Sequence, residues 1–471
     1  MDKESFRRHA HELVDWMADY LESVEDYPVR SQSAPGEMSE KLPASPPTRP
    51  EAFADIFNDF KTDVMPGITH WQHPRFFAYF PANASPPSIL AEMLTSTLAA
   101  NCMVWQTSPA GTEMETRVMD WLRQMIGLPD GFSGVIQDTA SSAILCAILT
   151  ARERISDWAV NEKGLGAVPP MAVYTSEQTH SSTEKNVKIA GLGVQALRKI
   201  PTDREYRLDV GALEKAIETD LANGIRPACV VASIGGTGVG AIDPLRDIGE
   251  FCQKHGIFLH VDAAWAGSAL ICPEYRWMID GIELVDSLVF NPHKWLLTNF
   301  DCSAHFLKSP NELIRIFSIL PEYLKGQNTG EVIDYRDWGV QLGRRFRALK
   351  LWFVIRSYGV EGLQALIRKH IALAESLESW VEADEAFQMV APRSLALVTF
   401  RYVRPGISDE VEHDRLNEEL LTRLNDEGFV YLTQNRLDGR YVIRFSIGQT
   451  DCELRHVEEG WEAIKRMASL I

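Results

Sequence analysis

The sequence has few cysteines for its length, and none of them form a cross-linking or zinc-binding pattern. Seven cysteines are spread over 471 residues, without a close pair or a Cys-x-x-Cys motif. This spacing argues against a disulfide framework and against a structural zinc site, so we predict no metal centre. The same spacing indicates that the protein resides in a reducing compartment. Internal repeats are also lacking.

Long apolar runs and clusters of positive charge are absent as well. The first 16 residues, MDKESFRRHAHELVDW, are charged throughout, so we expect neither a signal peptide nor a transmembrane helix, and a cytoplasmic location is the default. With 47 Lys and Arg against 65 Asp and Glu, the formal net charge is −18. An acidic chain without a basic run is a poor candidate for binding nucleic acid or anionic membranes.

The sequence does contain enough apolar residues for a large core. Hydrophobic residues make up 45% and charged residues 24% of the chain, which is ordinary for a soluble enzyme with two or three structural units. Strands are expected at 171–175, 229–234, 258–262, 287–290 and 304–307, with helices at 182–190, 210–222 and 245–254. This alternation predicts an α/β fold with a mostly parallel, doubly wound sheet.

Two charged residues follow predicted strands of this sheet. Asp262 ends the apolar run 257–262, and Lys294 comes shortly after the run 286–290. Strand ends in a parallel sheet face a ligand crevice. There a lysine can form a Schiff base with pyridoxal phosphate, while a carboxylate pairs with the protonated pyridine nitrogen. Either residue alone is more often solvated, but the aromatic and apolar neighbours of Lys294 favour the Schiff-base role.

A hydroxyl-rich turn precedes the same region. Residues 137–142, Gln-Asp-Thr-Ala-Ser-Ser, lie between a short predicted strand at 134–136 and a helix that runs to about Arg154. The free amide groups and positive dipole end of a helix N-terminus bind anions, so this turn is a candidate phosphate site. The alternative is a plain helix cap without a ligand.

An aromatic-rich stretch opens the chain's middle part. Residues 71–81 have the sequence Trp-Gln-His-Pro-Arg-Phe-Phe-Ala-Tyr-Phe-Pro. A loop with so many aromatic side chains, broken by prolines, is either a packing plug or the wall of a pocket. Upstream, predicted helices at 5–24 and 51–65 flank a polar loop at 31–50, and this arm has too little core to stand alone.

A glycine-rich stretch offers a competing interpretation. Residues 236–241, Gly-Thr-Gly-Val-Gly-Ala, fit the G-x-G-x-x-[GA] fingerprint of dinucleotide-binding proteins, and Asp262 follows about twenty residues later. We expect Asp243 to cap the next helix and Pro244 to begin it, which places Ala241 outside that helix. An NAD-dependent dehydrogenase is therefore a distant alternative.

The C-terminal third contains a polar loop and a second α/β pattern. Residues 321–330 include Tyr323 and two glycines, typical of a mobile lid, although the tyrosine could equally face solvent. Arg344, Arg345 and Arg347 open a predicted helix at 348–356, and we expect structural ion pairs from them. A helix at 362–383, strands at 396–402, 429–432 and 441–446, and a helix from Cys452 indicate a smaller α/β domain.

Three long motifs carry a resemblance to a known family. They are HVDAAWAGSALICPEYR at 260–276, FNPHKWLLTNFDCSAHF at 290–306 and LGRRFRALKLWF at 342–353. These motifs resemble the aromatic L-amino acid decarboxylases, the group II pyridoxal-phosphate-dependent decarboxylases, and the similarity runs from the first helix almost to the last residue. The resemblance implies a fold-type I enzyme with an N-terminal arm (1–85), a large cofactor domain (86–357) and a small C-terminal α/β domain (358–471). It also implies a homodimer whose active site lies at the subunit interface.

The resemblance assigns roles to individual residues. The cofactor, pyridoxal 5'-phosphate, is expected to contact Thr139, Ala140, Ser141, His180, Thr237, Asp262, Ala264, Asn291, His293 and Lys294. The substrate is expected to contact Trp71, Tyr79, Phe80, Pro81, Ala82, Asn101, Met103, His180, Thr237 and Gly343. From position alone, a lone histidine such as His180 is more often structural.

The catalytic residues implied by the resemblance are Lys294, Asp262, His180 and Tyr323. The amino acid displaces Lys294, His180 and Thr237 orient its carboxylate, and Asp262 stabilises charge through the ring nitrogen. Tyr323, supplied by the neighbouring subunit, returns a proton to Cα. In the oxidative, aldehyde-forming relatives this tyrosine is typically phenylalanine, so Tyr323 favours amine formation. An oxidative decarboxylase and a non-catalytic binding protein stay as alternatives.

The substrate is expected to be an aromatic amino acid. Histidine-selective relatives tend to carry serine at the position of Gly343. Ala82 replaces a threonine of the animal enzymes, and Asn101 and Met103 replace an isoleucine and a phenylalanine. These departures leave dihydroxyphenylalanine, tyrosine, tryptophan and phenylalanine all open.

Overall fold

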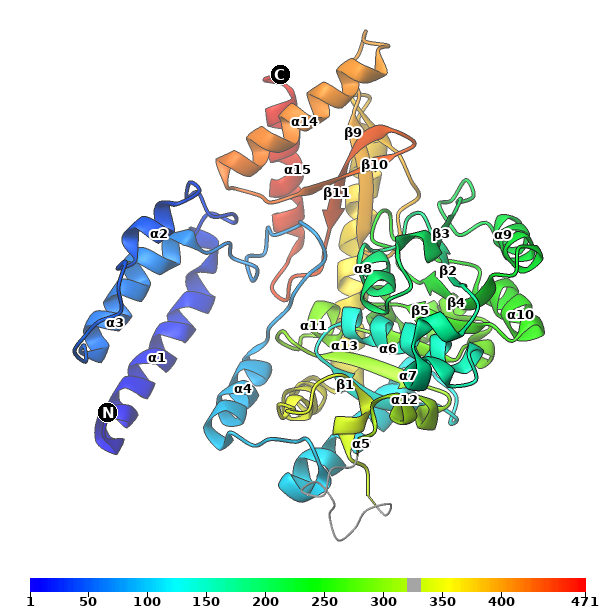
Figure 1. The fold of residues 1–471 in the computed structure, drawn as a ribbon. Helices are drawn as coiled ribbons and strands as arrows, with labels where there is room; N and C mark the ends of the chain where they lie inside the picture. The colour runs from blue at the N-terminus through cyan, green and yellow to red at the C-terminus, as the bar shows by residue number, and fades with distance from the viewer. Residues whose placement is uncertain (320–331) are drawn as a thin grey trace. The chain divides into compact units, whose positions relative to one another are not determined.

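The structure is a computed structural model that describes residues 1–319 and 332–471 (Figure 1). The chain forms two compact units. The first unit comprises Met1–Pro81, Leu373–Val390 and Val398–Ile471, and the second comprises Ala82–Ala372 and Ala391–Leu397. The division into an arm, a large domain and a small domain at residues 85 and 357 stays a prediction.

The second unit is built on a seven-stranded sheet. Its strands, in spatial order, are β1 (Ser133–Gln137), β7 (Ser303–Leu307), β6 (Ser287–Phe290), β5 (Phe258–Asp262), β4 (Arg226–Ser233), β2 (Met171–Ser176) and β3 (Leu197–Ile200). β7 is antiparallel to both of its neighbours, and the remaining pairs are parallel. The predicted mostly parallel sheet is thus confirmed. β3, whose charged sequence LRKI gave no apolar pattern, was not predicted.

The helices of this unit alternate with its strands along the chain, apart from α4 and α5 before β1. They are α4 (Pro86–Leu98), α5 (Pro109–Ile126), α6 (Ala140–Ile155), α7 (Ala159–Lys163), α8 (Ser182–Ile189), α9 (Val210–Ala222), α10 (Leu245–His255), α11 (Pro292–Trp295), α12 (Pro310–Phe317) and the first part of α13 (Arg347–Ala383). α6 packs on the sheet through Ile144 and Ile148, which lie in one buried cluster with Val173 and Val231. Burial of these β-branched and aliphatic groups fixes the face of the sheet on which α6 lies.

The arginines that were expected to form structural ion pairs lie at the start of α13 and just before it. Arg344 pairs with the buried Glu115, with 2.7 Å between Nη2 and Oε1; Arg345 pairs with Glu92, and Arg347 with Asp301. Each guanidinium therefore has a carboxylate partner within the protein. Two helices predicted at 348–356 and 362–383 are confirmed, because Gly359, with φ 65° and ψ 171°, interrupts the helical conformation within α13.

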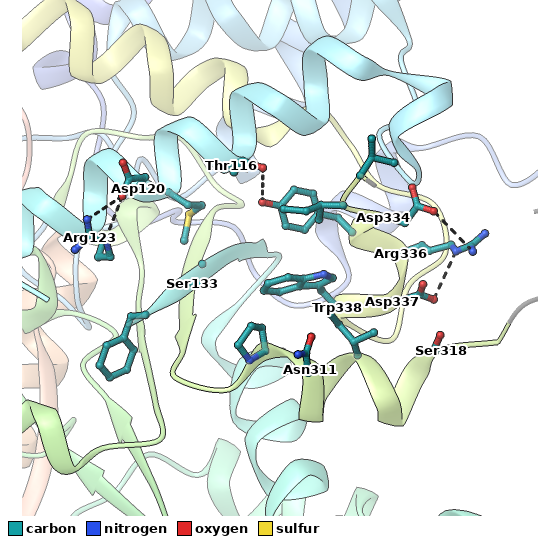
Figure 2. A pocket seen from close by; sticks show the side chains of 18 of the residues that line it. Thr116, Asp120, Arg123, Ser133, Asn311, Ser318, Asp334, Arg336, Asp337 and Trp338 are labelled. Atoms are coloured by element: carbon teal, nitrogen blue, oxygen red, sulfur yellow. Dashed lines mark hydrogen bonds and ion pairs between the residues drawn. The ribbon is translucent and has the colours of Figure 1, made fainter. Parts of the chain in front are cut away.

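A cavity of about 820 Å³ lies beside the N-terminal end of β1 (Figure 2). Met119, Phe132 and Trp338 contribute apolar surface to it. Its polar groups are paired with one another: Tyr335 and Thr116 are joined by a 3.0 Å hydrogen bond. None of the residues predicted to bind cofactor or substrate lines this cavity.

The first unit combines the N-terminal helices with the C-terminal α/β elements. It contains α1 (Lys3–Ser23), α2 (Glu37–Lys41), α3 (Phe53–Asp59), α14 (Glu410–Glu427), α15 (Leu454–Ala468) and the sheet β10 (Thr433–Leu437), β11 (Arg440–Ser446), β9 (Leu397–Tyr402), β8 (Phe387–Met389). Trp16 of α1 packs edge-on against Phe57 and Phe60. All three rings are only partly buried, so this contact joins the helices without enclosing a core.

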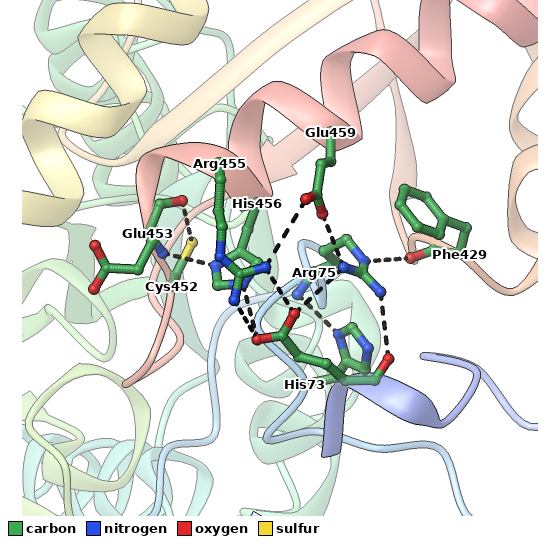
Figure 3. Close-up of polar contacts among 9 residues, drawn as sticks. His73, Arg75, Phe429, Cys452, Glu453, Arg455, His456 and Glu459 are labelled. Atoms are coloured by element: carbon green, nitrogen blue, oxygen red, sulfur yellow. Dashed lines mark hydrogen bonds and ion pairs between the residues drawn. The ribbon is translucent and has the colours of Figure 1, made fainter. Parts of the chain in front are cut away.

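Polar contacts tie the arm to α15 within the first unit (Figure 3). The carboxylate of Glu25 accepts from Arg455, with 2.9 Å between Oε2 and Nη1, and lies 3.1 Å from the ring of the buried His456. The hydrogen bond from Arg455 is the main reason why the pKa of Glu25 falls to about 2. Arg75 pairs with Glu459 at 2.9 Å in the same cluster.

Several predicted boundaries in this unit were wrong. The helix expected at 51–65 is present from Phe53 to Val64, with its last part, Phe60–Val64, in π rather than α conformation. A short helix, α2, interrupts the loop expected at 31–50. The strand expected at 429–432 lies instead at Thr433–Leu437, because Tyr431 is engaged in an isolated bridge with Phe76. Among the helices of residues 1–319 and 332–471, none has both the length and the apolar character needed to cross a bilayer.

Candidate active site

Lys294 lies directly after a central strand of the second unit. It sits in α11, four residues beyond the end of β6, and is half-buried. Its backbone N–H donates to Asn291 O at 2.9 Å, and the N–H of Asn291 donates to Ala264 O at 2.9 Å. These bonds join the lysine segment to the residues that follow β5.

Asp262 ends β5, the neighbour of β6, and is buried. It pairs in register with Val289, close to the end of β6. Its Oδ1 accepts from Ala264 N at 3.0 Å, and no hydrogen bond to Oδ2 is found within residues 1–319 and 332–471. A buried carboxylate with one oxygen to spare suits a cationic partner, such as a protonated ring nitrogen.

His180 is electrostatically connected to both residues. It follows β2, and its Nδ1 lies 2.8 Å from Ser182 Oγ. Burial lowers the pKa of His180, the negative charge of Asp262 opposes that effect, and the positive charge of Lys294 adds to it. The charges of Asp262 and Lys294 therefore act on His180, and all three residues end or follow strands at the carboxyl end of the sheet.

The predicted phosphate turn connects β1 to α6. Thr139 is the N-cap of α6, and its side chain makes no capping bond, so the amide groups of Ala140 and Ser141 have no partner within the helix. Ala140 packs with Ala264 and Val289 in one cluster. The turn is thus adjacent to the ends of β5 and β6.

Two polar side chains not expected from the sequence, Asn186 and Ser303, hold this turn in place. Asn186 Nδ2 donates to Ser141 O at 2.7 Å. Ser303 Oγ lies 2.7 Å from Asn291 Oδ1 and 3.3 Å from Asp138 O. Ser303 is the first residue of β7, which lies between β1 and β6, so its position follows from a strand order that the sequence does not reveal.

The glycine-rich loop 236–241 does not form a dinucleotide fingerprint. It is a closed turn in which Gly235 and Gly236 donate to Ala241 O at 3.0 and 2.9 Å, and the next helix begins only at Leu245. The predicted cap at Asp243 was wrong. That carboxylate is buried and accepts from Ser233 N and Leu208 N at 2.7 and 2.8 Å.

Burial raises the pKa of Asp243 to about 6. Because Asp243 also donates its N–H to Ser233 O, it closes the loop that carries Thr237 onto the end of β4. Ser233 pairs in register with Asp262, so Thr237 is presented at the same edge of the sheet as the aspartate.

Comparison with known proteins supports the same chemistry. Residues 35–403 match the model of the pyridoxal-dependent decarboxylase conserved domain. The chain belongs to this decarboxylase family. Fold-type I architecture and pyridoxal phosphate as cofactor, both expected from the motifs, are thereby confirmed.

Relatives of the decarboxylase are similar over its whole length. It is 42% identical to tyrosine decarboxylase 4 of Petroselinum crispum, with 100% of this chain and 94% of the relative covered. It is also 42% identical to phenylacetaldehyde synthase of Arabidopsis thaliana, with 100% and 97% covered. The crystal structure of Oryza sativa TDC with PLP and tryptamine superposes with a TM-score of 0.97 at 38% identity, covering 100% of this chain and 99% of that one.

The residues of this decarboxylase fit the coenzyme at both ends. The α6 N-terminus offers amide groups for a phosphate, and Asp262 offers a carboxylate for the ring nitrogen. On the loop after β2, next to His180, the hydroxyl of Thr179 is buried and has no hydrogen-bond partner among the described residues. A buried hydroxyl without a partner is unfavourable unless a ligand or water completes it.

His293 has a structural bond in addition to its predicted cofactor contact. Its Nδ1 accepts from the backbone N–H of Cys302 at 2.9 Å, and burial, aided by the charge of Lys294, lowers its pKa to about 3. The neutral ring can therefore fix the segment after Lys294 through one nitrogen while the other remains available. Its contact with the coenzyme stays a prediction.

The predicted substrate residues fall into two groups. In the second unit, Asn101 Nδ2 lies 3.7 Å from Met103 Sδ, and Asn101 Oδ1 accepts from Arg344 N, the neighbour of Gly343, at 3.0 Å. Ala82 is the first residue of that unit. The structure therefore brings Asn101, Met103 and Gly343 together on one wall.

The other group lies in the first unit. Trp71 and Tyr79 stack with ring centroids 5.7 Å apart, and the guanidinium of the buried Arg444 lies 5.1 Å from the ring centroid of Phe80. Pro81 packs against Gly448, where an added Cβ would come within 2.6 Å of the proline ring. Tyr323, the remaining predicted catalytic residue, lies outside the described residues.

Proposed function

We propose that this decarboxylase converts an aromatic L-amino acid to the corresponding amine and carbon dioxide. The observation that carries the proposal is the meeting of Lys294, Asp262 and His180 at the carboxyl end of the sheet, next to the α6 N-terminus. The similarity to tyrosine decarboxylase 4 and the aromatic residues Trp71, Tyr79 and Phe80 support an aromatic substrate.

Each residue has a distinct task in this proposal. Bound pyridoxal phosphate supplies an electron sink that accepts the pair left on Cα when the carboxylate departs. Lys294 provides the amine that attaches to the coenzyme aldehyde and is displaced by the substrate amine. Asp262 keeps the pyridine nitrogen protonated, and Thr139, Ala140 and Ser141 bind the phosphate.

His180 and Thr237 orient the substrate carboxylate, with Thr237 contributing its hydroxyl. The pKa of His180 is lowered mainly by burial, which favours a neutral imidazole as the ring that stacks on the coenzyme. Ala264, Asn291 and His293 line the coenzyme, and Tyr323 returns the proton to Cα.

The test is to incubate the coenzyme-loaded protein with tyrosine, tryptophan, phenylalanine and dihydroxyphenylalanine, with histidine and glutamate as controls, and to identify products by mass spectrometry. We expect amine without hydrogen peroxide from at least one aromatic substrate. Lys294→Ala should abolish turnover and the borohydride-stable attachment of coenzyme. Turnover of glutamate alone would contradict the aromatic assignment.

An aldehyde-forming oxidative decarboxylase is the second candidate, favoured by the 42% identity to phenylacetaldehyde synthase. The two reactions diverge after carbon dioxide leaves, when either a proton or dioxygen reaches the coenzyme-bound carbon. Tyr323 favours protonation. Tyr323→Phe should therefore divert product from amine toward aldehyde, ammonia and peroxide; a variant that still forms only amine would remove the role assigned to Tyr323.

We further propose that the enzyme is a homodimer with active sites at the subunit interface. In support, α4 exposes the apolar side chains of Leu90, Leu94 and Leu98 at helical spacing, with exposed fractions of 52%, 46% and 62%. A row of this kind on a single helix is characteristic of a surface that another chain covers. Leu94→Glu should yield monomers in light scattering, whereas Glu113→Lys on the neighbouring α5 should not.

Shared active sites can be tested by mixing two variants that are each expected to lose amine production. Lys294→Ala lacks the coenzyme amine, and Tyr323→Phe lacks the proposed proton donor. If the two residues come from different subunits, refolding the variants together should restore amine production in mixed dimers. No restoration would contradict a site built from two chains.

A cytoplasmic location is proposed with these assignments, because all seven cysteines are buried free thiols.

A further inference from the structure

The segment that follows Lys294 has an unfavourable backbone conformation. α11 is only four residues long, and isolated helices of this length have little stability of their own. Three residues after the lysine, Leu297 has a φ of 54°, in the left-handed region that side chains with a Cβ disfavour. Such a conformation persists only where neighbouring groups hold it.

Two serines of α4 hold this segment. Ser85 Oγ donates to Leu297 O at 2.8 Å. Ser88 Oγ accepts from Asn299 N at 2.8 Å and donates to Asn299 Oδ1 in a short hydrogen bond. Their exposed fractions are 1% and 0%, so water does not compete for either hydroxyl.

Ser85 makes this bond instead of the usual local one. It occupies the N-cap position of α4, where a serine side chain normally accepts from an amide of its own helix. No such capping bond is present, and the hydroxyl is turned toward Leu297 O. The hydroxyl thus bonds to a residue 212 positions along the chain. This indicates that it stabilises the backbone at Leu297 rather than the N-terminus of α4.

The other contacts that hold the lysine segment are made by Trp295, before Leu297. Trp295 stacks on Trp265 with ring centroids 5.1 Å apart and donates from Nε1 to His370 Nδ1 at 2.9 Å. These contacts fix the end of α11, but the backbone from Leu297 to Asn299 is reached by side chains of α4. Within the described residues, Thr298 contributes only a local bond from its own hydroxyl to Leu296 O.

We propose that Ser85 and Ser88 are positioning residues that set the orientation of Lys294 toward the coenzyme. The inference rests on the proposed role of Lys294. Without the two hydroxyls, Leu297 relaxes toward an ordinary backbone conformation and α11 turns with it. The lysine amine then meets the coenzyme aldehyde in a poorer geometry, although no group that touches substrate has been altered.

The experiment compares Ser85→Ala, Ser88→Ala and the wild-type holoenzyme. The control is Ser156→Ala, which removes another buried serine hydroxyl, one that donates to Glu153 O at 3.1 Å. It lies beyond the C-terminal end of the 16-residue α6, roughly 24 Å along that helix from the phosphate turn. Three quantities are measured: the coenzyme dissociation constant, the spectrophotometric pKa of the lysine–coenzyme linkage, and kcat with KM for the aromatic substrate.

We expect each α4 variant to weaken coenzyme binding about tenfold and to move the linkage pKa by about one unit, as for the loss of one buried hydrogen bond. The value of kcat should fall by a similar factor with KM little changed, and the control should match wild type. Ser88→Ala keeps the hydrogen bond of Ser85, so this variant still tests the proposal if Ser85→Ala does not fold.

Two outcomes would overturn the proposal. Either the α4 variants keep the wild-type linkage pKa and coenzyme affinity, whatever their thermal stability, or the control changes by the same amounts. Failure of the proposed function is recognised separately, because wild-type protein would then carry no borohydride-stable coenzyme on Lys294. Attachment in wild type with unchanged α4 variants would refute only the positioning role.

Discussion

His305 offers a direct test of how burial controls the protein's stability. It lies in β7 with an exposed fraction of 0%, and neither ring nitrogen has a hydrogen-bond partner among the described residues. Its nearest aromatic neighbour is His260, whose ring centroid is 6.0 Å away. Burial lowers the pKa of His305 to about 3, so the folded protein holds this ring neutral.

The sign of the effect follows from proton binding. In the unfolded chain a histidine has a pKa of about 6.5, so as pH falls the unfolded state binds a proton first. The contribution of His305 is complete above pH 6.5 and is lost as pH falls from there toward 3. At pH 5 the loss is about 1.5 pH units at 1.36 kcal/mol each, or about 2 kcal/mol.

We expect His305→Phe to remove this loss. Phenylalanine has a similar shape and no unpaired nitrogen, so stability at pH 7.5 should be no lower than in wild type. Urea unfolding of coenzyme-free protein at pH 7.5 and pH 5, at one protein concentration, should show about 2 kcal/mol less acid destabilisation in the variant. Substitution of the exposed His11 by glutamine is the control. Equal acid destabilisation in wild type and His305→Phe would refute the assignment.

Two further substitutions test contacts around the site. Arg344→Met should leave the buried carboxylate of Glu115 without its cationic partner, although Ile136 N still donates to it, with a loss of about 3–5 kcal/mol in urea unfolding. Glu115→Leu in the same chain should recover much of that loss; a single variant as stable as wild type would contradict the pairing. Gly235→Ala should place a methyl group 2.5 Å from Ala266 Cβ at a φ of 79°, with a loss of at least about 2 kcal/mol and weaker coenzyme binding. Unchanged coenzyme affinity there would show that the loop after β4 does not shape the site.

The sequence predicted the central strands and the residues at their ends because those strands are apolar on both faces. Runs such as 258–262 and 287–290 have few interpretations other than buried parallel strands, and their bounds agree with the structure. The charged strand β3 lacks this pattern, since only Ile200 of its four residues is buried. Its place in the sheet follows from pairing with β2, which no local pattern encodes.

The supports of the site were harder to foresee. Asp243 precedes a proline and a helix, so a capping role was the natural prediction. Its carboxylate instead accepts hydrogen bonds from the backbone N–H groups of Leu208 and Ser233. Ser85 and Ser303 act through bonds to residues far away in the sequence, Leu297 and Asp138. A serine hydroxyl carries no local sequence pattern that reveals so distant a partner. A lysine that stands beside a tryptophan just after an apolar strand does belong to a recognisable pattern.

The position of β7 between β1 and β6 has a consequence for how the protein is made. The phosphate turn follows β1, whose Ser133 pairs with Leu307 of β7, while the lysine segment precedes β7 directly. During synthesis, therefore, β1 cannot join the sheet through β7 until the ribosome has produced residue 307, long after the phosphate turn has emerged. Long-range pairing of this kind is slow to form. Nascent chains that stop before β7 should pass through the cell without taking up pyridoxal phosphate, so coenzyme capture marks the completion of the sheet.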